Sequence, residues 1–216
     1  MDAIFLLLDN LRSNRPTASL AFSKTETTRR TVTKILTAAR EIFTRDGHDG
    51  LTLRNVADEA EIAVGNLTYH FQSKCELLEA MLRETLTDYV DAHVEEIRRD
   101  SDEPIEALSN VVGFYARNAE HTHRFFYQVW GYAASSEDAK AIVRELYGAI
   151  GRIVYYLVRA ANPKLSDTQI RRATLQICSL EEGYKFIIGM EFKDRTAINT
   201  AEKDIRALAR RIVMSE

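Results

Sequence analysis

Amide, hydroxyl and small side chains stand close together in the stretch Val64-Gly65-Asn66-Leu67-Thr68. Asn66 and Thr68 can exchange hydrogen bonds with the edges of nucleobases, and Val64 can contact a thymine methyl group. Gly65 carries no side chain, which permits the close approach of another molecule. On one exposed helix, these residues would have the chemistry to read base sequence in a DNA groove.

A second set of groups nearby suits phosphate oxygens, which bind hydroxyls, cations and helix N-termini. Thr52, Tyr69, His70 and Lys74 carry such groups. The alternative role of Thr52 is to cap its own helix, and that of His70 is to pack beneath the surface. Three further cations are interpreted as solvated surface charges: Arg29, Arg30 and Lys34.

The sequence offers no comparable set of groups for catalysis or metal binding. His121 and His123 are two residues apart, which puts them on different faces of a helix, and no cysteine is near. A Gly-rich phosphate loop and a nucleophile elbow are both lacking. We therefore predict no catalytic centre, metal or cofactor. An enzyme with its site among the C-terminal helices and a helical protein-interaction module are the two alternatives.

Apolar periodicity predicts the helices that position these groups. A stripe from Val32 to Phe43 indicates a helix from Arg29 that ends at Gly47 and Gly50. Two short helices with a turn at 61–63 form a helix-turn-helix over residues 52–71. A long helix follows from a capping box at 73–76 to about residue 99. Pro104 starts another helix, and more are expected near 122–134, 136–160, 166–189 and 200–213, with caps at Ser166 and Asn199. The fold class is all-α, with about nine helices.

Residues 29–89 resemble the DNA-binding domain of the tetracycline-repressor (TetR) family. The resemblance is densest at residues 60–71, AEIAVGNLTYHF, where the family pattern reads like A-G-V-S-x-G-x-L-Y-Y-H-F. This chain departs from the pattern at Glu61, Ala63 and Thr68. Further matching residues lie outside that stretch: Ile35-Leu36, Ala38-Ala39, Phe43, Gly47, Leu51-Thr52, Val56-Ala57, Ser73-Lys74 and Leu77-Leu78.

The resemblance implies a transcriptional regulator, most often a repressor, that acts as a homodimer on double-stranded DNA. Dimer symmetry implies a palindromic operator with half-sites about one helical turn apart. We therefore expect a flexible extension at 1–28, a DNA-binding domain at 29–89 and a helical domain for effector binding and dimerisation at 90–216. No effector is identified by the sequence.

Aromatic residues are concentrated in the C-terminal half, where thirteen of the nineteen lie between Phe114 and Phe192. Helices this rich in aromatic side chains can enclose a pocket for an apolar or aromatic small molecule. The alternative is a well-filled core. The residues predicted to line the pocket are Phe125, Trp130, Tyr155 and Tyr184.

Two C-terminal stripes have the spacing of helix–helix seams. One repeats at intervals of three and four residues between 170 and 187, and the other lies in the last helix. Two such helices from each of two chains would form a four-helix dimer interface, as the family resemblance implies, although burial within one chain is the alternative. The expected interface residues are Ile170, Ala173, Ile177, Leu180, Tyr184, Ile205, Leu208 and Ile212.

Composition limits the remaining possibilities. The net charge of −3 excludes a polycation that coats nucleic acid, although residues 29–74 carry seven Lys or Arg against six Asp or Glu. The apolar run 4–8 is too short for a membrane helix, which needs about 20 residues. Two cysteines fit a reducing compartment. We expect a cytoplasmic protein without a membrane partner.

Overall fold

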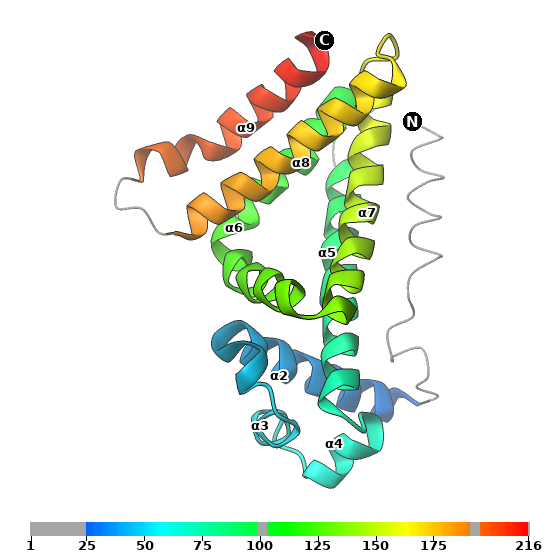
Figure 1. Cartoon of the computed structure of the whole chain (residues 1–216), viewed down its shortest axis with the longest axis vertical. Helices are drawn as coiled ribbons and strands as arrows, with labels where there is room; N and C mark the ends of the chain where they lie inside the picture. The colour runs from blue at the N-terminus through cyan, green and yellow to red at the C-terminus, as the bar shows by residue number, and fades with distance from the viewer. Residues whose placement is uncertain (1–24, 99–102, 191–194, 216) are drawn as a thin grey trace. The chain divides into compact units, whose positions relative to one another are not determined.

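The computed structural model of this 216-residue chain describes residues 25–98, 103–190 and 195–215. All regular structure within these ranges is helical, as expected (Figure 1). The eight helices described are α2 (Glu26–Gly50), α3 (Leu53–Glu59), α4 (Val64–His70), α5 (Lys74–Arg98), α6 (Pro104–Ser135), α7 (Glu137–Ala161), α8 (Asp167–Gly189) and α9 (Thr196–Ser215).

Contacts divide the described residues into two compact units. The N-terminal unit contains residues 25–88 and 124–146. The C-terminal unit contains residues 89–98, 103–123, 147–190 and 195–215. Segment 124–146, which the sequence analysis assigned to the C-terminal domain, therefore belongs to the N-terminal unit by its contacts. Helices α5, α6 and α7 each contribute residues to both units.

Helix α2 begins earlier than the sequence analysis predicts. The Thr25 side chain caps it by accepting a hydrogen bond from the Thr28 amide, so residues 26–28 form a helical turn rather than part of an extension. The rest of that expected extension, residues 1–24, lies outside the described ranges. The apolar stripe of α2 is buried, with Phe43 at its centre packing edge-on against Phe125 and Tyr132.

Gly47 bends α2 near its end. Its backbone has φ 72° and ψ −168°, a conformation that side chains disfavour. The space beside it is also filled, because a Cβ atom at this position would lie 2.7 Å from Oε1 of Gln128. The backbone conformation therefore requires glycine, whereas the end of the flexible Gln128 side chain can move aside. Gly47 thus ends the straight part of α2 where the sequence pattern predicts.

Two C-terminal helix boundaries differ from the prediction. The helices expected to meet near residue 122 are one helix, α6, since Thr122 donates to the Asn118 carbonyl within the helix instead of interrupting it. Helix α9 begins at Thr196, so Asn199 lies in its first turn and not at its cap. At α8, the expected cap is present, with Ser166 and Gln169 satisfying each other's backbone amides.

Helix α8 faces the core of the C-terminal unit with a stripe that includes charged residues. Ile170, Ala173 and Ile177 are buried first, and the same stripe continues through Glu181 and Lys185 before Ile188. Helix α9 packs against α8. A chain of ion pairs ties α9 to its neighbours: Arg117 bonds Glu96 and Glu202, and Arg206 bonds Glu202 and Asn110.

Candidate nucleic-acid interface

Helices α3 and α4 form the predicted helix-turn-helix. Thr52 caps α3 by accepting a hydrogen bond from the Asn55 amide at 3.1 Å. In the turn, the Ile62 amide donates to the Ala57 carbonyl at 3.0 Å, which reverses the chain into α4. Leu67 is the buried side chain of α4, and Phe71 is buried just after the helix. These two anchors hold α4 against the unit and leave its other face outward.

The outward face of α4 carries the residues predicted to read bases. Val64 is 42% exposed, and Gly65 and Asn66 are also exposed. Thr68 is half-buried, and its hydroxyl donates to the Gly65 carbonyl at 3.2 Å. The helix thus brings three of the four predicted base-reading residues to the open surface. The Thr68 hydroxyl instead donates its hydrogen bond within the helix.

Gly65 has no packing reason to be glycine. A Cβ atom built there meets no atom within 4 Å, and the residue lies inside α4, where glycine costs helix stability. Open space beside a helical glycine fits a surface that another molecule approaches closely.

The residues predicted to contact phosphate divide into two groups. Tyr69 is 81% exposed, and its ring lies edge-on to the half-buried His70. Thr52 is exposed but also performs the capping role that was its alternative. Lys74 is half-buried, and its Nζ donates to the His48 carbonyl at 2.6 Å. Lys74 therefore fixes the end of α2 to the start of α5, a role that its sequence position did not indicate.

The cations at the start of α2 lie on the surface, as interpreted from the sequence. Arg29, Arg30 and Lys34 are exposed. Arg30 pairs with Glu26 at 3.2 Å, and Lys34 pairs with Glu61 at 3.5 Å. Exposed pairs of this kind contribute little to stability.

Comparison with known proteins identifies the type of helix-turn-helix that α3 and α4 form. Residues 35–81, which include α3 and α4, match the family described as bacterial regulatory proteins, tetR family. The helix-turn-helix part of the chain therefore belongs to the TetR family. An HTH-type transcriptional repressor, KstR2 of Mycolicibacterium smegmatis, is 31% identical over 90 residues, or 42% of this chain and 43% of the relative. An uncharacterised HTH-type regulator of Xanthobacter autotrophicus is 26% identical over 125 residues, which are 56% of this chain and 62% of the relative.

These matches span about two fifths to three fifths of the curated relatives' length. Solved structures extend the likeness of fold over most of the chain. A transcriptional regulator from Pseudomonas aeruginosa PAO1 has a TM-score of 0.70 at 18% identity, covering 88% of this chain and 96% of its own. A regulator from Saccharomonospora viridis in complex with choline has a TM-score of 0.70 at 17% identity, covering 83% and 95%. FadR from Bacillus subtilis in complex with stearoyl-CoA has a TM-score of 0.64 at 15% identity, covering 82% of this chain and 96% of its own.

Glu61 stands where the TetR pattern has glycine. It adopts φ 49° in the turn before α4, the left-handed region that glycine occupies without strain. We expect Glu61→Gly to raise the free energy of unfolding by about 1 kcal/mol, a rise of a few degrees in Tm, because the strain of a side chain at positive φ disappears. Thermal unfolding followed by circular dichroism measures the change.

Glu61→Gln is the matched control, since it removes the charge and keeps the strained side chain. Its Tm should equal that of the wild type, because the exposed Lys34 pair contributes little. Equal gains in both variants would assign the effect to charge and contradict the backbone argument.

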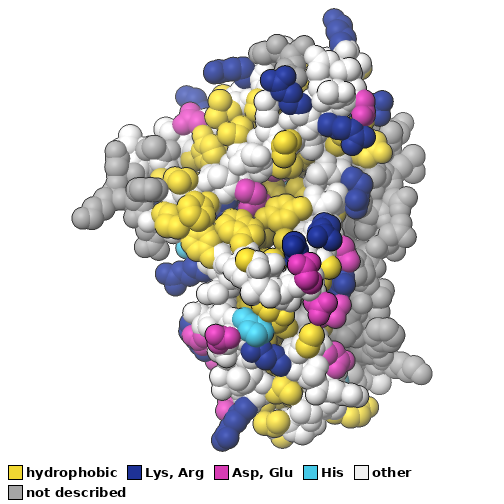
Figure 2. Space-filling view, in the orientation of Figure 1, with side chains coloured by type: hydrophobic (Ala, Val, Ile, Leu, Met, Phe, Trp, Pro, Cys, Tyr) yellow, Lys and Arg dark blue, Asp and Glu magenta, His cyan; other side chains and the backbone are white. Residues whose placement is uncertain are grey.

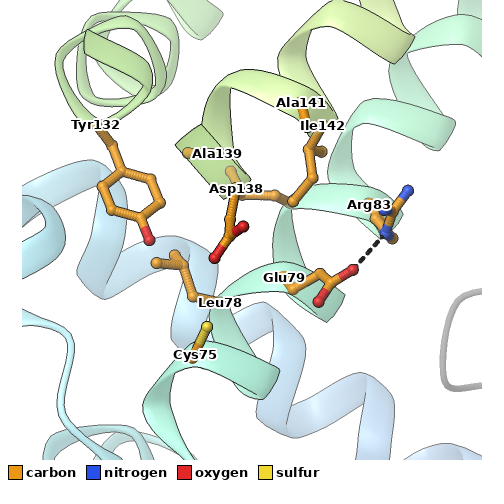
Figure 3. Close-up of a pocket in the computed structure, with 10 residues that line it drawn as sticks. Cys75, Leu78, Glu79, Arg83, Tyr132, Asp138, Ala139, Ala141 and Ile142 are labelled. Carbon is orange, nitrogen blue, oxygen red and sulfur yellow. Dashed lines mark hydrogen bonds and ion pairs between the residues drawn. The ribbon is translucent and has the colours of Figure 1, made fainter. Parts of the chain in front are cut away.

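A small pocket lies elsewhere in the N-terminal unit, between the start of α5 and the junction of α6 with α7 (Figure 3). Tyr132 and Asp138 face it from one side, and Cys75 and Leu78 from the other, with Arg83 held by Glu79 at its edge. Its volume of about 140 Å³ is below that of pockets for drug-sized molecules, roughly 300–1,000 Å³. We do not assign this pocket to the effector.

The four aromatic residues predicted to line an effector pocket are not gathered in one place within either unit. Phe125 is buried against Phe43 in the N-terminal unit, where Trp130 packs near Phe126. In the C-terminal unit, the Tyr155 hydroxyl donates to Asp167. Tyr184 lines a groove between α8 and α9. Phe125 is a core residue of its unit, and the effector pocket itself stays a prediction.

The expected dimer residues also separate into two groups. Ile170, Ala173, Ile177 and Ile205 are buried within the single chain, whereas Leu180, Tyr184, Leu208 and Ile212 are half-buried. The large apolar residues that α8 exposes are Leu175, Phe186, Ile187 and, just after its end, Met190. Of these four residues, only Ile187 belongs to the apolar stripe that the sequence analysis described between 170 and 187. No helix within the described ranges is long and apolar enough to cross a membrane.

Proposed function

We propose that this TetR-family chain is a homodimeric regulator that binds a palindromic DNA operator through α4 and releases it when a small molecule binds the C-terminal unit. The observation that carries the proposal is the outward face of α4. Tyr69 is 81% exposed on this face, and Gly65 beside it meets open space. As a regulator of bacterial genes, it would act in the cytoplasm.

A second copy of the chain is proposed to pack on the α8–α9 surface. Figure 2 shows hydrophobic side chains gathered over the region of α8 and α9. A groove of about 460 Å³ lies there, lined by Leu180, Tyr184, Ile187 and Ala201 among others. Exposed apolar patches of this kind mark interaction sites. A two-fold dimer would present two α4 helices, which must lie about 34–36 Å apart or a near multiple to meet successive major grooves.

Ligand response is proposed because two structural neighbours were solved with small molecules bound, choline and stearoyl-CoA. Helix α5 begins directly after α4 and continues into the C-terminal unit. A ligand that binds one position of α5 more tightly than another would change operator affinity.

Selection of DNA from a random duplex library tests the proposal, with Gly65→Ala as the diagnostic variant. The wild type should enrich an inverted repeat. Gly65→Ala should unfold at a slightly higher temperature, by up to about 1 kcal/mol in free energy, and yet bind that repeat at least about tenfold more weakly, because a methyl group enters the base-facing surface.

Gly131→Ala serves as the control, since Gly131 also meets no atom within 4 Å but lies on α6. It should leave operator affinity unchanged. Failure to enrich any inverted repeat would overturn the regulator proposal and favour a protein-interaction module. Unchanged affinity in Gly65→Ala would show that α4 does not face the bases.

A further inference from the structure

The core of the C-terminal unit contains a fully buried ammonium group. Lys185 on α8 has no exposed surface, although lysine is rarely buried without a specific role. Around it lie side chains from three helices, which together we call the Lys185 centre. Its members are Tyr89 and His93 of α5, Tyr115 of α6, and Glu181, Glu182 and Lys185 of α8.

The ammonium group of Lys185 is held as a bound organic cation would be. Its Nζ lies 4.8 Å from the ring centroid of Tyr89 and 4.7 Å from that of Tyr115. The nearest oxygen of Glu182 is 3.7 Å away. Aromatic faces combined with a carboxylate attract ammonium groups electrostatically, most strongly when water is excluded.

Several buried polar atoms of the centre form no hydrogen bond with a described protein atom, among them the Tyr115 hydroxyl and three acceptors. Glu181 is 1% exposed, and its Oε1 forms no hydrogen bond with any described protein atom. The same holds for Oε2 of Glu182 and for Nε2 of His93. The His93 Nδ1 is 2.5 Å from the Tyr89 carbonyl and so carries the proton, which makes Nε2 an acceptor. Each buried polar atom without a partner costs about 1–3 kcal/mol.

Burial also shifts the pKa values of the ionisable groups in the centre. Burial raises the pKa of Glu181 well above its usual value, and Glu182 adds to the rise. Burial lowers the pKa of His93 to about 4 and that of Lys185 to about 8. Burial therefore favours the neutral form of His93 and shifts Glu181 toward its protonated form, while Lys185 stays paired with Glu182. A second cation would allow Glu181 to ionise, whereas an anion would add a further negative charge.

We propose that the Lys185 centre binds a small organic cation of the alkylammonium class, which pairs with Glu181 and packs against the tyrosine faces. The inference rests on the proposed function, because it names the chemistry of the effector. The Glu182 side chain is 23% exposed, so the centre borders the surface at this residue. Tyr89 and His93 belong to α5, the helix that begins next to α4, so the ligand would contact the element that carries the response.

The test measures thermal unfolding of the full chain with tetramethylammonium and butylammonium chloride, against sodium butyrate and sodium chloride at equal ionic strength. At concentrations well above Kd, the two ammonium salts should raise Tm by several degrees, since a ligand that binds only the folded state stabilises it. Butyrate should have no effect beyond that of sodium chloride. The same ammonium salts should weaken binding to the selected operator at least about tenfold.

Glu181→Gln keeps the shape of the side chain and removes the charge, so it should abolish both responses. Glu137→Gln, an exposed carboxylate on α7, is the control and should keep them. If Glu181→Gln fails to fold, Tyr115→Phe replaces it. Loss of the Tyr115 hydroxyl should change the affinity for butylammonium at least about threefold while leaving the ring in place.

The affinity for tetramethylammonium should rise up to about tenfold from pH 6.5 to pH 7.5, because Glu181 must lose its proton to pair with the cation. Lys185 keeps most of its charge in this range and His93 stays neutral. The titratable groups that face Glu181 or its neighbour are Tyr89, His93, Tyr115, Tyr147, Cys178, Glu182 and Lys185.

A response to butyrate in place of the ammonium salts would overturn the inference, as would no response to either or a full response in Glu181→Gln. If an inverted repeat is still selected in those cases, the effector chemistry alone is wrong. If no repeat is selected, the proposed function itself fails.

Discussion

Gly47→Ala is expected to lower the free energy of unfolding by about 3 kcal/mol, which corresponds to a fall in Tm of roughly 5–15 °C. The cost comes from the backbone. An alanine at φ 72° and ψ −168° is strained by about 1–3 kcal/mol, whereas its contact with Oε1 of Gln128 is relieved when that flexible side chain moves. Because Gly47 sets where α2 ends, operator binding should weaken as well. Thermal unfolding and operator titration measure the two effects.

Gly131→Ala is again the control, since it lies in the same unit, within α6, and its Cβ meets open space. Alanine favours helix over glycine, so this variant should be as stable as the wild type or slightly more stable. A wild-type Tm in Gly47→Ala would mean that the bend in α2 relaxes without cost, and that its glycine is not required by the fold.

Ile187→Glu is expected to convert the proposed dimer to a monomer and to weaken operator binding at least about 100-fold. Ile187 is 49% exposed in the chain and lines the α8–α9 groove. A carboxylate at this position would have to lose its water when a second copy packs on it. A monomer contacts one half-site, and joining two sites strengthens binding by about 10²–10⁴-fold. Light scattering gives the mass, which is 24.6 kDa for one chain.

Tyr156→Glu, on the exposed part of α7, is the matched charge control. It should remain dimeric and bind the operator as the wild type does. A dimeric Ile187→Glu protein would show that the α8–α9 surface is not the interface. A wild-type chain that is monomeric at micromolar concentration would contradict the dimer itself.

Short-range patterns were sufficient to predict the DNA-binding part. The stripe that ends in Phe43 and the cap at Thr52 depend only on neighbours within a few residues along the chain. Leu67 and Phe71 are spaced to anchor α4, which leaves Val64 and Asn66 outward. Residues spaced three or four apart lie on the same side of a helix, because 3.6 residues make one turn, so the buried and exposed sides of α4 follow from the sequence.

Longer-range features were predicted less well. The role of Lys74 depends on the His48 carbonyl, which is 26 residues away in the sequence. The strain at Glu61 depends on the path of the turn, which residue type alone does not reveal. The break expected near Thr122 is absent because its hydroxyl bonds within the helix, and both outcomes fit the same local sequence.

Helix α8 shows most clearly what only the tertiary structure decided. From the sequence alone, the apolar spacing predicts a seam through Leu180 and Tyr184, since charged residues are normally placed outside. In the structure, the buried stripe instead continues from Ile177 through Glu181 and Lys185. The sequence determined that α8 is an amphipathic helix, because that property is local. The tyrosine rings of α5 and α6 decided which side is buried, because they lie beside the Lys185 ammonium group and offset the free-energy cost of removing it from water.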